Sequence, residues 1–143
     1  MYHIQHSGYG YSKHICEDVI DWFITKYVPR HKIFLHVEHK GLKREQAYGF
    51  CDFVDECYRP RQFLIEIQSR LPKELYVKTL LHELVHLRQW VKGTLTFRSG
   101  KMHFENENVD SMLYHEQPHE IEAHNLEDKL YAKYMSDIQK GDY

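Results

Sequence analysis

The chain lacks the features that mark several classes of protein. Its 143 residues contain three cysteines, Cys16, Cys51 and Cys57. This odd number, without a C-x-x-C spacing, favours a reduced intracellular protein over a disulfide scaffold. No segment approaches about 18 consecutive apolar residues, and the N-terminus has no apolar signal core. We therefore expect no membrane span, no secretion signal and a cytoplasmic location.

A large excess of charge is also missing. The formal net charge is −2, so the charge balance gives no reason to expect a nucleic acid or a membrane as partner. No repeat, low-complexity tract or linker divides the chain, and residues 1–143 are predicted to form one domain. Histidine, by contrast, is abundant, with twelve residues, which makes metal binding worth testing.

Hydrophobic periodicity predicts the order of the elements. Apolar residues at three- and four-residue intervals predict helices, and strict alternation predicts half-buried strands. The predicted elements are an irregular segment over residues 1–11, a helix between Ser12 and Pro29, strands over residues 32–39, 47–54 and 62–69 joined by a link (40–46) and a turn (55–60), a helix over residues 73–93 and a final helix from Pro118. The predicted class is α+β, with helices on one face of a small, mostly antiparallel sheet.

Residues 94–117 show no clear periodicity. A structureless connection of this length is unusual in a compact domain, and long loops often bind substrate or act as lids. Disorder is the alternative interpretation.

The sequence His82-Glu83-Leu84-Val85-His86 lies inside the predicted helix 73–93 and has the H-E-x-x-H pattern. Two histidines four residues apart lie on one side of a helix and can bind the same zinc ion. Leu80, Leu84 and Leu87 fall on the opposite side, so one face is predicted to enter the core and the other to project the histidines into open space. The alternative is a chance match of five residues.

A catalytic zinc site needs a third protein ligand. The segment from residue 115 to 135 offers five candidates: His115, His119, Glu120, Glu122 and His124. On a helix from Pro118, Glu120 and His124 lie on or beside the apolar face, whereas Glu122 points to the opposite side. An inward carboxylate needs a cationic partner, which makes Glu120 the preferred third ligand. The alternative is that both glutamates simply favour the positive end of the helix dipole.

Together, the H-E-x-x-H pattern and Pro118-His119-Glu120-Ile121-Glu122-Ala123-His124 resemble the gluzincin branch of the zincin metallopeptidases. The chain is similar to the small SprT-like and minigluzincin single-domain proteins, several of which are encoded by phages or prokaryotes. The resemblance implies that Glu120 is the third ligand, that His124 supports a zinc-bound histidine, and that the edge strand of the sheet, here residues 62–69, lines the substrate cleft. Two departures are the histidine at 124, where Asp or Asn is common, and the Glu ligand, where SprT proteins use His.

The predicted function is therefore that of a zinc-dependent metallopeptidase acting on a peptide or protein substrate. His82, His86 and Glu120 would hold Zn²⁺, and Glu83 would accept a proton from the zinc-bound water that attacks the peptide bond. The candidates for a donor to the oxyanion are Tyr114, His115 and His119.

Two rival functions belong to other classes. One is a catalytically silent, zincin-like module that binds metal and mediates interactions or associates with DNA, and the other is a purely structural zinc site. Glu83 argues against both, because neither role needs a general base beside the metal. The sequence indicates no oligomeric state.

Overall fold

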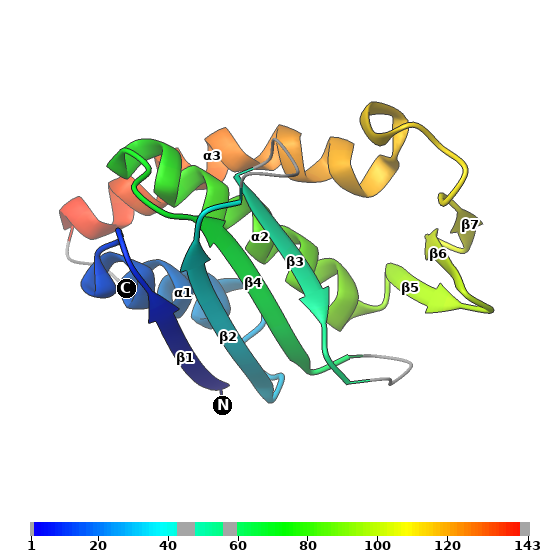
Figure 1. Cartoon of the computed structure of the whole chain (residues 1–143), viewed down its shortest axis with the longest axis horizontal. Helices are drawn as coiled ribbons and strands as arrows, with labels where there is room; N and C mark the ends of the chain where they lie inside the picture. Colours follow the sequence, from blue (N-terminus) through cyan, green and yellow to red (C-terminus); the bar gives the residue numbers. More distant parts are fainter. Residues whose placement is uncertain (1, 43–47, 56–59, 141–143) are drawn as a thin grey trace.

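The structure is a computed structural model that describes residues 2–42, 48–55 and 60–140. Within these residues three α-helices and two sheets form an α+β fold (Figure 1), which confirms the predicted class. The helices are α1 (Lys13–Tyr27), α2 (Lys73–Lys92) and α3 (Pro118–Lys140), and a 3₁₀ turn, η1, spans Tyr114–Glu116. The strands are β1 (Tyr2–Gly8), β2 (Ile33–Lys40), β3 (Gly49–Phe53), β4 (Gln62–Gln68), β5 (Leu95–Arg98), β6 (Lys101–Phe104) and β7 (Glu107–Asn108).

The larger sheet has the strand order β1-β2-β4-β3. β1 pairs with β2 in parallel, β2 pairs with β4 in parallel, and β3 runs antiparallel beside β4. The prediction of a mostly antiparallel sheet is therefore wrong. The first two strands are parallel because α1 carries the chain back between them, as a crossover helix does between parallel neighbours.

β1 occupies most of the segment that was predicted to be irregular. Its side chains alternate between half-buried and exposed at the edge of the sheet, and its backbone pairs with β2 from Tyr2 opposite Ile33 to Gly8 opposite His39. Backbone hydrogen bonds to β2 and the packing of Tyr2 and Ile4 against the core hold this strand in place. Two apolar residues are too few for hydrophobic periodicity to detect a strand, which explains the error.

The predicted positions of the remaining strands agree with the structure, but their order in the sheet does not. β4 was predicted to be the edge strand beside the cleft, yet it lies between β2 and β3, and β3 is the edge. The chain folds back so that β3 covers the outer side of β4. Two segments lie outside the described residues. Residues 43–47 belong to the predicted link and the start of the second predicted strand, and residues 56–59 belong to the predicted turn.

The predicted helices are confirmed. The side chain of Ser12 caps α1 by accepting a hydrogen bond from the backbone N–H of Ile15 at 3.2 Å, and α2 ends at Gly93, which adopts a left-handed conformation with φ of 81°. Figure 1 shows α1 and α2 behind the larger sheet, with α3 running across the ends of its strands. In the part of the chain that the structure describes, no helix is both long and apolar enough to cross a membrane.

Residues 94–117 do not form the long loop that was predicted. They contain the three-stranded sheet β5-β6-β7, whose neighbours are antiparallel, and then η1. Ser99 and Gly100 connect β5 to β6, and Glu105 and Asn106 connect β6 to β7; all four have positive φ angles. Two successive residues of this kind are typical of the tight type I′ turns of hairpins. The strands themselves are too short to show a period.

The C-terminal helix is tied to α1 by side-chain hydrogen bonds. The indole N–H of Trp22 donates to Asp137 Oδ2 at 2.8 Å, and the hydroxyl of Tyr134 donates to Asp18 Oδ2 at 2.5 Å. Lys26 forms an ion pair with the same Asp137 carboxylate. These contacts fix the far end of α3 and so help to fix the position of its first turns against α2.

Replacing Gly8 with alanine should detach β1. Gly8 has φ of +103°, and a Cβ atom there would lie 2.0 Å from the backbone oxygen of His39 in the neighbouring strand. We expect Gly8→Ala to lower the free energy of unfolding by about 2–4 kcal/mol, from backbone strain and the clash together. Urea unfolding measures this change.

Gly100→Ala is the matched control, because Gly100 also has positive φ but a Cβ atom there would meet nothing within 4 Å. It should cost only the backbone strain of about 1 kcal/mol. Equal losses in the two variants would contradict the contact with His39.

Candidate functional site

α2 places His82, Glu83 and His86 at the base of a cleft. Their exposed fractions are 7%, 6% and 6%. The prediction that this face of the helix projects the histidines into open space is therefore wrong. β3 and α3 contact α2, so the polar face of the helix is covered as well as its apolar face, and the histidines face a cleft rather than bulk solvent.

The carboxylate of Glu120 lies between the two imidazoles. Its Oε1 atom is 3.2 Å from His82 Nε2 and 3.1 Å from His86 Nε2. These three residues offer ligand atoms that all lie within 4.8 Å of one another. Two imidazole nitrogens and a carboxylate oxygen are a donor set that zinc accepts in proteins. The residues present therefore fit a divalent metal ion.

The charges in this group depend on one another. Burial acts to raise the pKa of Glu120, but the hydrogen bonds from His82 and His86, the charge of His86 and the hydroxyl of Tyr114 together hold that pKa well below its usual range. Burial acts to lower the pKa of His86, and its hydrogen bond to Glu120 and the nearby Glu83 raise it. Glu120 is thus kept as an anion that requires positive charge beside it, which protonated histidine or a metal ion can supply.

Glu83 points into the cleft next to this group. Burial, and to a smaller degree the charges of Glu120 and Glu127, raise its pKa to about 7, although both histidines act to lower it. A carboxyl group with this pKa exchanges its proton near neutral pH, as a general base requires. β3 approaches closely here: a Cβ atom on Gly49 would lie 3.2 Å from Glu83 Cγ.

Gln89 connects His86 to Glu122. His86 Nδ1 lies 2.8 Å from Gln89 Oε1, and Gln89 Nε2 donates to the backbone oxygen of His119 and to Glu122 Oε1. Because both partners of Nε2 are acceptors, the amide oxygen must face His86. The neutral ring of His86 then carries its proton on Nδ1, which leaves Nε2 available to a metal.

The expected direction of Glu122 is therefore wrong. It was predicted to point away from the helix interface, but its Oε1 atom is 2.9 Å from Gln89 Nε2 on α2. The helical wheel of α3 alone cannot show this contact, because the long side chain of Gln89 reaches across from the neighbouring helix.

The remaining candidates have different surroundings. Tyr114, on η1, donates a hydrogen bond to Glu120 Oε1 at 3.0 Å and lines the cleft. His119 is buried, its Nδ1 atom lacks a hydrogen-bond partner among the described residues, and burial lowers its pKa. His124 lines the cleft near Tyr114, whereas the side chain of His115 is 76% exposed and lies outside the cleft. The structure thus brings Tyr114, His119 and His124 to the cleft, whereas His115 lines a smaller neighbouring pocket that Glu120 and His124 also border.

The cleft has a volume of about 920 Å³ and two different ends. One end holds the charged group, and the other has an apolar wall that the sequence did not predict: Phe53, Trp90, Leu95, Phe97 and Met102. Phe53 contacts Trp90 with ring centroids 4.8 Å apart. Glu127, at the charged end, was also missed, although its position three residues after His124 on one helix could have suggested it.

Comparison with known proteins finds a partial similarity to an acetyltransferase. The chain is 29% identical over 73 residues to the spermidine N(1)-acetyltransferase of Vibrio cholerae serotype O1, a match that covers 51% of this chain and 42% of that protein. The chain therefore matches less than half the length of this relative. No model of a known protein family matches the chain, and no solved structure matches it.

This similarity contradicts the prediction of a zinc metallopeptidase. The similar protein is a transferase by name, not a hydrolase, and no comparison links the chain to proteases or to SprT-like proteins. The rival prediction of a silent interaction module gains no better support. An H-E-x-x-H pattern describes only how two histidines and a glutamate are spaced along a helix. This spacing alone does not identify the reaction that a site catalyses.

The raised pKa of Glu83 predicts how stability depends on pH. Burial disfavours the ionised form of Glu83, so ionising it lowers the free energy of unfolding. This loss is absent below pH 4.5, the ordinary pKa, and complete above about pH 7. In metal-free protein, Glu83→Gln should therefore gain stability relative to wild type between pH 5 and pH 8, by about 3 kcal/mol at most. Urea unfolding at the two pH values tests this.

Glu116→Gln, which removes an exposed carboxylate on η1, is measured as the control for the loss of one carboxylate. A pH-independent effect of Glu83→Gln would show that burial does not hold its carboxyl in the neutral form.

Proposed function

We propose that this protein binds a divalent metal ion, with zinc as the expected ion, through His82, His86 and Glu120. The observation that carries the proposal is the half-buried Glu120 carboxylate, whose Oε1 atom faces the Nε2 atoms of two histidines at 3.2 and 3.1 Å. A half-buried carboxylate with imidazoles on two sides is costly without positive charge, and a zinc ion supplies this charge while using all three donors.

The surroundings of the group suit a metal that binds a further ligand. Three protein donors leave one position of a tetrahedral zinc ion open, and the group lies in a cleft of about 920 Å³. Zinc, when bound, would act as a Lewis acid toward a molecule in this cleft. Glu83 would accept a proton from that molecule, while the hydroxyl of Tyr114 keeps its hydrogen bond to Glu120 Oε1.

We propose a zincin-like arrangement, in which the H-E-x-x-H helix lies behind a mixed sheet and the following helix brings the third ligand. The order of β1, α1, β2, β3, β4, α2 and α3 supports it, as does the position of the antiparallel edge strand β3 beside the cleft.

Zinc titration tests the metal site. Wild-type protein should bind one Zn²⁺ ion tightly, as measured by isothermal titration calorimetry. His86→Ala and Glu120→Gln should each abolish this tight binding, because each removes a ligand atom. Glu122→Gln should weaken it by no more than about tenfold, since Glu122 acts only through Gln89.

Glu116→Gln, which removes an exposed carboxylate on η1, should bind zinc as wild type does. Equal losses in Glu120→Gln and Glu122→Gln would contradict the assignment of the third ligand. An absence of tight zinc binding in wild type would remove the proposal.

Acetyl transfer to an amine is the second candidate function, and the similarity to a spermidine N(1)-acetyltransferase supports it. Three carboxylates at one end of the cleft, those of Glu83, Glu120 and Glu127, would attract a polyamine cation. Glu83 would take the proton of the attacking amine, because a carboxylate with a pKa of about 7 is a stronger base than an ordinary one.

An acetylation assay separates the two candidates. With acetyl coenzyme A and spermidine as probes, an acetyltransferase releases coenzyme A thiol at a rate that depends on spermidine and falls strongly in Glu83→Gln. The exposed variant Glu116→Gln should keep the wild-type rate. The second candidate is eliminated if the assay releases no thiol, whether or not zinc is added. The first candidate is retained if the same protein binds zinc tightly.

A further inference from the structure

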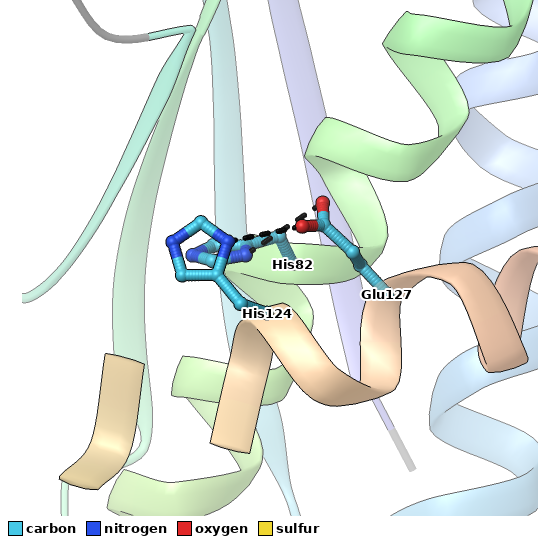
Figure 2. A group of neighbouring side chains, drawn as sticks. All are labelled: His82, His124 and Glu127. Carbon is cyan, nitrogen blue, oxygen red and sulfur yellow. Dashed lines mark hydrogen bonds and ion pairs between the residues drawn. The ribbon is translucent and has the colours of Figure 1, made fainter. Parts of the chain in front are cut away.

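The charged end of the cleft contains a second group of metal-binding side chains. His82, His124 and Glu127 offer ligand atoms that all lie within 4.8 Å of one another. Figure 2 shows the Glu127 carboxylate beside both imidazoles. Its Oε1 atom is 3.1 Å from His124 Nδ1, and its Oε2 atom is 3.9 Å from His82 Nδ1. We propose that this group is a second divalent-cation site, which extends the proposed metal function and rests on it.

The two groups share His82 but use opposite sides of its ring. His82 Nε2 faces Glu120 at 3.2 Å, whereas His82 Nδ1 faces Glu127 at 3.9 Å. The two carboxylates come from α3, one before and one after His124. A neutral imidazole has one nitrogen lone pair and one N–H, so His82 can bind both ions only when its ring proton is released to solvent and the ring bridges the two ions as an imidazolate. His82 therefore lies between two anionic positions, each of which is completed by a second histidine.

The second group resembles the first in its donors but not in its accessibility. Both consist of two histidines and one glutamate, a donor set suited to zinc. The side chains of His124 and Glu127 are 53% and 25% exposed, whereas those of His86 and Glu120 are 8% and 14% exposed. His124 and Glu127 both line the cleft. An ion can therefore reach the second position from the cleft.

Different accessibility implies different affinity. The buried ligands of the first position are held by α2, α3 and Gln89, whereas the exposed ring of His124 loses more freedom when it binds an ion. Two divalent ions on one imidazole also repel each other. The second position should therefore fill only after the first. An ion there would occupy the charged end of the cleft, so that excess zinc competes with any cationic ligand.

Zinc titrations of single-residue variants test this arrangement, because His82 belongs to both groups. Wild type should bind two Zn²⁺ ions, one tightly and one more weakly. His124→Ala and Glu127→Gln should each keep the tight ion and lose the weaker one. His86→Ala should keep the weaker ion alone, and His82→Ala should bind neither.

Asp128→Asn is the matched control, since it removes one exposed negative charge from the same turn of α3 without touching either group. It should bind both ions. Persistence of the weaker ion in both His124→Ala and Glu127→Gln, or a single ion in wild type, would overturn the second site and leave the first intact. If wild type binds only a weaker ion, and that ion depends on His124, the proposed function would be overturned instead.

A measurement on wild type covers the case in which His82→Ala fails to fold. During zinc titration followed by NMR, the imidazole signals of His86 should change with the first equivalent, and those of His124 should change only with the second. Simultaneous changes at both rings, or no change at His124, would contradict a separate second position.

Discussion

The contact on which this structure depends joins a carboxylate on one helix to two imidazoles on another. Glu120 from α3 faces His82 and His86 from α2, and the interface between these helices forms around it. A half-buried anion of this kind is tolerated only where positive charge or hydrogen bonds compensate its loss of water. Protonated histidine or the proposed metal ion would supply that positive charge where α2 and α3 meet.

Much of this arrangement follows from local patterns in the sequence. The period of α2, its glycine cap and the four-residue spacing of its histidines are contained in one continuous segment, so they could be predicted without knowledge of the fold. The inward direction of Glu120 followed from the apolar face of α3. Predictions of this type succeed because a helix places residues three and four apart on one side whatever surrounds it.

Other features depend on partners that are distant in the sequence. β1 places only Tyr2 and Ile4 against the core and depends on its hydrogen bonds to β2. The turn at Ser99 and Gly100 is defined by backbone angles that several residue types adopt. The contact between Glu122 and Gln89 joins two helices, as does the position of Glu127 beside His82. The function was mispredicted for a related reason: the spacing of ligands describes a site, whereas the partial likeness to an acetyltransferase concerns a wider stretch of chain.

Gly49 has an effect that goes beyond its own strand. Because it has no side chain, the edge strand packs closely on α2: a Cβ atom at this position would lie 3.0 Å from Thr79 Cγ2 and 3.2 Å from Glu83 Cγ. A larger residue at position 49 would push β3 away from α2 or displace Glu83. The width of the cleft beside this acid therefore depends on the absence of a side chain on the edge strand.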